Sequence, residues 1–194
     1  MYRTGGEVAM RPLWLLSLLV FCSPVLALAR EDAEWWYLNP YLGGIVPDKP
    51  WGGNGSTVLY GLDIGRSLSA AWSAELDMNG APLSDRYGAG RVGLYGGALT
   101  LLRVFNRGAR FAPYVSLGAG LTHVAPPSGV PLESRTEFMA QPGVGALVRV
   151  WEGSAGLRAL ALRPDVKARW THGWAHAPGN PVDVLYVLGL TFEF

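Results

Sequence analysis

The chain has 194 residues, a formal net charge of +1 and only 16% charged side chains, against about 25% in a typical soluble domain. This near-neutral balance gives no sign of nucleic-acid binding or of electrostatic adsorption to a membrane surface. Its length corresponds to one domain, and it is rich in glycine, with 26 residues, and in tryptophan and tyrosine, with eight of each.

Residues 1–29 have the pattern of a secretory signal peptide. Two arginines precede an apolar run that ends in Ala27, Leu28 and Ala29, the small-x-small pattern at which signal peptidases cut. We therefore expect cleavage after Ala29 and a mature domain of residues 30–194. An uncleaved transmembrane helix is the alternative, although Pro24 interrupts the run and the run is short for a membrane span.

After the first 29 residues, successive segments alternate apolar residues with polar or small ones, as β-strands with one apolar face do. The segment WWYLNPYLGGIV alternates least clearly. No apolar stretch here approaches the roughly 20 residues that a membrane helix requires. We expect strands within residues 35–46, 57–65, 70–78, 90–105, 114–122, 138–150, 162–170 and 186–194.

The connections between these segments alternate between long and short. The long connections are PDKPWGGN, NGAPLSDR, APPSGVPLESR and HGWAHAPGNPV, and the short ones lie around RSLS, NRGAR and EGSA. Outer-membrane barrels combine longer external loops with short periplasmic turns. The sequence therefore predicts an all-β fold, an eight-stranded antiparallel up-and-down transmembrane β-barrel with both ends in the periplasm. A soluble β-sandwich or lipocalin-like barrel is the alternative.

We expect the apolar face of each strand to contact lipid and the face with glycines and charges to point inward. In residues 90–105 this places Leu94, Ala98 and Leu102 outside, and Arg91 and Arg103 inside. Side chains just fill the interior of an eight-stranded barrel, and buried charges must be paired there. The predicted salt-bridge network that plugs the lumen consists of Asp63, Glu75, Asp77, Arg91, Arg103, Arg149, Arg163, Asp165, Lys167, Arg169 and Glu193. A narrow, gated ion path is the alternative reading of these charges.

The last segment, YVLGLTFEF, keeps its alternation up to Phe194. It resembles the C-terminal signal of outer-membrane barrels, a glycine followed by two alternating aromatic residues, here Gly189, Phe192 and Phe194. The resemblance implies recognition by the barrel-assembly machinery through strand pairing. Other aromatic residues also gather near the expected periplasmic rim, as in an interfacial girdle.

Four stretches resemble the N-terminal transmembrane domain of OmpA-like proteins: WYLNPYLGGIVPDKPWGGNG, IGRSLSAAWSAELDMNG, FAPYVSLGAGL and LRPDVKARW. The resemblance covers roughly residues 34–194 and implies a monomeric barrel in a Gram-negative outer membrane, in contact with its lipids and lipopolysaccharide. It also implies a structural, envelope-integrity or surface-interaction role. We do not expect cell-wall anchoring, because the sequence leaves no residues for a periplasmic peptidoglycan-binding domain.

The stretch THGWAHAPGN more weakly resembles the active-site region of lipid A deacylases, which makes an outer-membrane acyl hydrolase the alternative function. In that comparison His172 is present, but Trp174 stands where the nucleophilic serine belongs. Thr171, next to His172, points to the opposite side of a strand. We therefore expect no enzyme activity and no catalytic residues.

We also expect no metal site and no cofactor. His123, His172 and His176 are the three histidines of the sequence. His172 and His176 share a loop but have no neighbouring carboxylate or thiol. No phosphate-binding loop or nucleotide motif occurs.

Overall fold

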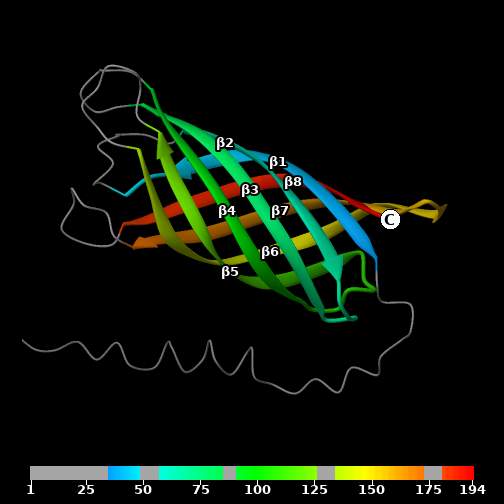
Figure 1. Ribbon diagram of the computed structural model, residues 1–194. Helices are drawn as coiled ribbons and strands as arrows, with labels where there is room; N and C mark the ends of the chain where they lie inside the picture. The colour runs from blue at the N-terminus through cyan, green and yellow to red at the C-terminus, as the bar shows by residue number, and fades with distance from the viewer. Residues whose placement is uncertain (1–34, 49–56, 85–90, 126–133, 173–180) are drawn as a thin grey trace, which may run out of the picture.

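The computed structural model describes residues 35–48, 57–84, 91–125, 134–172 and 181–194 (Figure 1). The expected signal peptide, including Ala27 and Ala29, and His176 lie outside these residues. No helix among them is long and apolar enough to cross a membrane. The strands are β1 (Trp36–Val46), β2 (Thr57–Ser67), β3 (Trp72–Ser84), β4 (Arg91–Val104), β5 (Phe111–Ala125), β6 (Arg135–Ala155), β7 (Leu157–His172) and β8 (Val182–Glu193).

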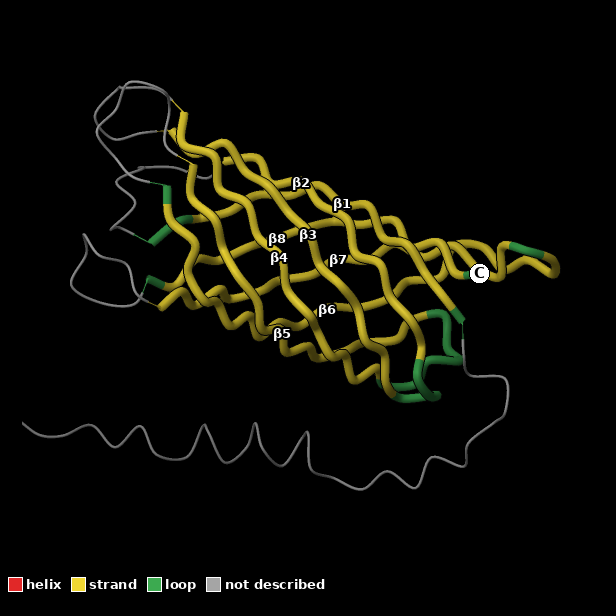
Figure 2. Tube along the Cα trace, in the orientation of Figure 1, coloured by secondary structure: helices red, strands yellow, loops and turns green. Residues whose placement is uncertain are grey.

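These strands form a closed barrel in chain order, and β8 pairs with β1 (Figure 2). Every neighbouring pair is antiparallel, so the predicted eight-stranded up-and-down barrel is confirmed. Closure gives every strand two neighbours and leaves no open sheet edge. The chain enters β1 and leaves β8 at the same end, where the backbone N–H of Phe194 donates to the carbonyl of Trp36 at 2.8 Å.

The two ends of the barrel differ in their connections. At the end where β1 begins, β2 and β3, β4 and β5, and β6 and β7 are joined through residues 68–71, 105–110 and 156. We call this the turn end, and the opposite end the loop end. The predicted alternation of long and short connections is matched only in part, because residues 85–90, between β3 and β4, are as few as residues 105–110, between β4 and β5.

The outer wall is apolar around its circumference. Large apolar side chains on it have exposed fractions from 36% at Leu190 to 73% at Leu99, and they come from many strands, including Leu42, Val58, Leu99, Leu117, Val144 and Leu188. The buried side chains of the same strands include many polar and charged ones, such as Asp63, Glu75, Arg163 and Lys167. A soluble barrel would show the opposite distribution, with its apolar face inward.

Strand β4 has the opposite orientation to the one expected from its sequence. Leu94, Ala98 and Leu102 are buried inside the barrel, whereas Tyr95 and Leu99 are exposed on the outer wall. Both faces of β4 are apolar, so alternation alone does not determine which one faces the lumen. The pairing with β3 decides it, because inward residues of β3 stand opposite even-numbered residues of β4.

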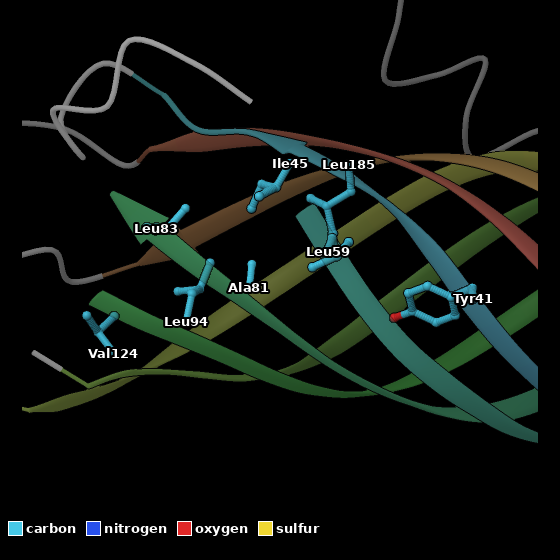
Figure 3. Close-up of a cluster of buried hydrophobic side chains, with 8 residues drawn as sticks. All are labelled: Tyr41, Ile45, Leu59, Ala81, Leu83, Leu94, Val124 and Leu185. Carbon is cyan, nitrogen blue, oxygen red and sulfur yellow. The ribbon is translucent and has the colours of Figure 1, made fainter. Parts of the chain in front are cut away.

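The lumen at the loop end contains a cluster of apolar side chains (Figure 3), and the buried carboxylates Asp183 and Glu137 lie at the same end. Ile45 and Leu59 have no exposed surface there, and Leu94 and Leu185 are 1% exposed. The complete cluster is Tyr41, Ile45, Leu59, Ala81, Leu83, Leu94, Val124 and Leu185. A second inward apolar cluster lies at the turn end and consists of Leu102, Val104, Ala112 and Tyr114.

The hairpin of β6 and β7 extends beyond the other strands at the turn end (Figures 1 and 2). Its register shifts between Arg149, opposite Ala161, and Trp151, opposite Leu160, so that Val150 forms a β-bulge. A bulge inserts one residue and thereby exchanges the two faces of the strand. Trp151 consequently lies on the outer side with Leu160.

Candidate functional site

Three basic side chains of β7 reach across the lumen to β3. Arg163 donates two hydrogen bonds to Glu75, from Nη1 to Oε2 at 2.8 Å and from Nη2 to Oε1 at 2.9 Å. Lys167 Nζ is 2.8 Å from Asp77 Oδ2. In the closed barrel, three strands separate β3 from β7 on either side, so these contacts join opposite walls.

The third cross-lumen contact is a hydrogen bond from Arg169 Nη2 to Asn79 Oδ1, at 2.8 Å. The three donors and the three acceptors follow the same order along the chain because β3 and β7 run in the same direction. Residues two apart in a strand share one face, so all six side chains point inward. We refer to these three contacts, Arg163–Glu75, Lys167–Asp77 and Arg169–Asn79, as the cross-lumen struts.

The struts are buried and well supplied with hydrogen-bond partners. Asp77 has no exposed surface, and it also accepts hydrogen bonds from Tyr41 Oη at 2.6 Å and Gln141 Nε2 at 2.9 Å. Tyr37 Oη donates to Glu75 Oε2 at 3.0 Å. Such additional bonds offset the cost of removing charges from water.

Two further carboxylates lie next to the struts at longer distances from the cations. Asp63 Oδ2 is 3.4 Å from Arg163 Nη1 and accepts a hydrogen bond from Asn39 Nδ2 at 2.7 Å. Asp165 Oδ2 is 3.5 Å from Lys167 Nζ and 3.9 Å from Arg163 Nη2. Seven of the predicted network residues therefore meet in the lumen: Asp63, Glu75, Asp77, Arg163, Asp165, Lys167 and Arg169.

The remaining predicted residues do not join this cluster. Arg149 and Glu193 lie at the turn end, where Arg149 Nη2 is 3.8 Å from Glu193 Oε2 and its Nη1 is 3.6 Å from Glu152 Oε1. Because the two faces of β4 are opposite to the expected ones, Arg103 lies on the outer side of the barrel. Its guanidinium lies over the rings of Trp72 and Phe105. Arg91 also begins β4, but its side chain is outside the described residues.

The neutral members of the network were not identified from the sequence. Tyr114 Oη accepts a hydrogen bond from Arg163 Nε at 2.8 Å, and Gln141 Oε1 accepts one from Arg169 Nε at 3.1 Å. Tyr37, Tyr41 and Asn79 also belong to this group. Each of them lies on the inward face of its strand, as the charged residues do. This position is the sequence signal that could have identified them.

Small residues leave room for these tyrosines. Tyr114 stands directly opposite Gly145 in the pairing of β5 with β6, and Tyr41 stands opposite Gly61 in the pairing of β1 with β2. A Cβ atom on either glycine would overlap the tyrosine ring beside it. The inward glycines are therefore required by the large side chains that cross the lumen.

A separate group of side chains covers the lumen at the turn end. Arg107, in the turn between β4 and β5, donates to the hydroxyls of Ser67 and Ser73 and to the carbonyl of Ser69. Its guanidinium lies 5.3 Å from the centre of the Trp35 ring. Burial lowers the pKa of the Arg107 guanidinium from its ordinary value, although an arginine remains charged in proteins.

Arg158 lies 5.0 Å from the same Trp35 ring. We call Trp35, Arg107 and Arg158 the turn-end cap. Between the cap and the struts is a cavity of about 10 Å³, lined in part by Tyr37, Arg163 and Thr191. That volume holds about one water molecule.

The predicted terminal signal residues lie along the seam between β8 and its neighbours. Gly189 is inward and stands opposite Tyr41 of β1 and Arg163 of β7. Phe192 and Phe194 are on the outer face, and Phe194 is 47% exposed. Phe194 is also the residue whose N–H bonds to the first strand.

The described histidines do not form a hydrolase-like centre. His172 is exposed at the end of β7, with its ring centre 5.5 Å from that of Trp170, while the side chain of Thr171 is buried on the opposite face. His123 Nδ1 lies 2.9 Å from the Thr136 hydroxyl. Within the described ranges, no carboxylate forms a hydrogen bond with the His123 imidazole. A catalytic triad requires such a bond to orient its histidine.

No family model and no curated protein matches the sequence. Among solved structures, the chain is similar to the N-terminal β-barrel domain of OprF from Pseudomonas aeruginosa, with 16% identity and a TM-score of 0.53 over 82% of this chain and 97% of that one. It is also similar to neisserial surface protein A, with 12% identity and a TM-score of 0.60 over 84% of this chain and 98% of that one. Together with its closed eight-stranded topology, this likeness shows that the chain has an OmpA-like β-barrel fold.

Proposed function

We propose that this chain is an integral outer-membrane barrel with a closed lumen and a structural, envelope-integrity or surface-interaction role. The distribution of polarity supports the membrane location, since the outer wall exposes large apolar side chains and charges lie buried within. A closed barrel also satisfies its backbone hydrogen bonds without water, as a lipid environment requires.

Three groups of side chains, one after another along the barrel axis, support the proposal of a closed lumen. The turn-end cap lies over the cavity of about 10 Å³, the cross-lumen struts occupy the middle, and the apolar cluster of Figure 3 lines the loop end. Eight strands enclose an interior that side chains just fill. An ion would have to break the struts and then enter an apolar layer that resists wetting.

We infer a non-catalytic role from the state of the buried side chains. The strut carboxylates accept hydrogen bonds from lysine, arginine, tyrosine and glutamine, and these bonds hold them in structural positions. The alternative is a lipid A acyl hydrolase, which would use His172, the histidine in the stretch that resembles the deacylase active site. Loss of lipid A deacylation in His172→Ala would support that alternative.

We further propose that the barrel is a monomer in contact with outer-membrane lipids and lipopolysaccharide, assembled by the barrel-assembly machinery. Its exposed outer aromatics at the turn end, Trp36, Phe111, Trp151 and Phe194 among them, suit the membrane–water interface. The turn end would then face the periplasm.

Membrane fractionation combined with gel migration tests this proposal. The protein should be recovered with outer membranes, and the unboiled sample should migrate differently from the boiled one because the folded barrel resists detergent. Recovery in the soluble periplasm with identical migration of both samples would contradict it. A deletion strain examined for both envelope integrity and lipid A composition would separate the structural role from the hydrolase alternative.

A further inference from the structure

A polar pocket lies at the turn end, at the base of the hairpin formed by β6 and β7. Its volume is about 440 Å³, within the range of roughly 300–1,000 Å³ that is usual for small-molecule sites. Three parts of the chain line it: the residue before β1, the hairpin itself and the end of β8. The side chains that line it are Trp35, Arg149, Glu152, Arg158, Ala159 and Glu193.

The hairpin extends past its neighbours (Figure 1), and its bulge brings two opposite charges to the pocket. Strand β5 pairs with β6 as far as Val148, and β8 pairs with β7 as far as Ala159. Residues three apart in a regular strand point to opposite faces. The bulge at Val150 exchanges the faces, so Arg149 and Glu152 lie on the same side, with Arg149 Nη1 3.6 Å from Glu152 Oε1.

One part of the pocket carries an excess of negative charge. Arg149 lies between two carboxylates, because its Nη2 is also 3.8 Å from Glu193 Oε2. One cation beside two anions leaves this part of the pocket with one negative charge. Both distances are longer than a hydrogen bond. The Glu152 carboxylate, which is exposed, is therefore available to a donor on a ligand.

The other part of the pocket is positive because of Arg158. This side chain is exposed, and its guanidinium lies 5.0 Å from the centre of the Trp35 ring. Stacking on a ring orients a guanidinium but uses none of its five N–H donors, whose planar arrangement suits a carboxylate. A ligand in the pocket would thus meet an acceptor on β6 and donors on β7.

We propose that this pocket binds a small zwitterion, a short peptide with free ends, and that Arg158 binds its carboxylate and Glu152 its ammonium group. The division of charge within the pocket complements such a ligand. An anion alone would face the excess carboxylate, and a cation alone would leave Arg158 unmatched. The proposed orientation of the barrel places this site in the periplasm, whereas binding itself does not depend on that orientation or on the closed lumen.

The test is saturation-transfer NMR of the dipeptide alanyl-alanine with the full mature chain, refolded in micelles of a non-ionic detergent. Saturable binding at one site is expected. The N-acetylated dipeptide lacks the ammonium group, and the dipeptide amide lacks the carboxylate. Each should bind about tenfold more weakly than the free dipeptide, as expected for a lost hydrogen bond to a charged group.

Two variants assign the two ends of the ligand. Arg158→Gln should bind the dipeptide about tenfold more weakly, and it should bind the amide equally well because the carboxylate has lost its partner. Glu152→Gln should likewise bind the free and the N-acetylated dipeptide equally. Arg110→Gln is the matched control, since Arg110 is an exposed arginine at the turn end that does not line the pocket. It should bind like the unmodified protein.

Equal binding of the dipeptide and its two blocked forms would overturn the site, as would equal losses in Arg158→Gln and Arg110→Gln. Displacement of the dipeptide by inorganic phosphate alone would also overturn it, because the pocket would then be an anion site. Gel migration of unboiled samples is recorded for every variant. A protein that lacks heat-modifiable migration would contradict the proposed membrane barrel itself, whereas a folded barrel that binds no dipeptide would contradict only this pocket.

Discussion

Arg163 and Glu75 stand on opposite walls of the barrel and are joined across its lumen by two hydrogen bonds of 2.8 and 2.9 Å. The pair links β7 to β3, which are not neighbours in the sheet. Together with Lys167–Asp77 and Arg169–Asn79, it braces the cross-section of the barrel from within. The struts therefore stabilise the closed shape in addition to filling it.

Breaking one strut should destabilise the barrel strongly. Lys167→Met leaves the Asp77 carboxylate buried without its cation, and removing one partner of a buried pair typically costs about 3–5 kcal/mol. Asp77→Asn should also be destabilising, and the double variant should cost less than the sum of the two. Urea unfolding of the refolded protein in detergent micelles, followed by gel migration, measures these free energies.

Glu152→Gln is the control for the strut variants, because the Glu152 side chain is 70% exposed and its contact with Arg149 is 3.6 Å. An exposed ion pair contributes about 0–1 kcal/mol. An effect of Lys167→Met no larger than that of Glu152→Gln would show that the struts do not stabilise the fold.

Gly145→Ala should destabilise the barrel because the added Cβ would overlap the Tyr114 ring. Overpacking of this kind costs about 1–3 kcal/mol. Gly97→Ala is the matched control, since a Cβ at Gly97 meets nothing within 4 Å. The same urea titration compares the two, and equal midpoints would contradict the tight packing of Tyr114 against Gly145.

The barrel should conduct no stable current in planar lipid bilayers. Trp35→Ala combined with Leu59→Ala removes part of the turn-end cap and part of the loop-end apolar cluster. We expect this double variant to remain closed, because the struts still occupy the middle of the lumen. Stable openings in the unmodified protein would contradict the closed lumen, and openings confined to the double variant would place the barrier at the two ends.

Phe194→Asp should reduce the amount of folded barrel in outer membranes more than Phe111→Asp does. Both aromatic side chains are exposed at the turn end, with exposed fractions of 47% and 59%. Only Phe194 also lies at the seam, where its N–H bonds to Trp36 of the first strand. Heat-modifiable protein in membrane fractions measures assembly, and equal losses in the two variants would contradict a special role for the terminal residue.

The sequence alone determined the strand content, the approximate positions of the connections, and the inward face of most strands. Those properties are local, because a period of two along a strand assigns each side chain to one of two faces. It placed Asp77 and Lys167 inside the barrel for this reason. The alternation failed in β4, where both faces are apolar and only pairing with β3 distinguishes them.

The tertiary structure decided which inward side chains meet. Arg163 and Glu75 are 88 positions apart, and Arg169 and Asn79 are 90 apart, so no local pattern indicates these contacts. They depend on barrel closure, which brings β3 opposite β7, and on the register of every strand between them. The turn-end cap also joins residues that are far apart in the sequence, because Arg107 lies in the turn after β4 whereas Trp35 precedes β1.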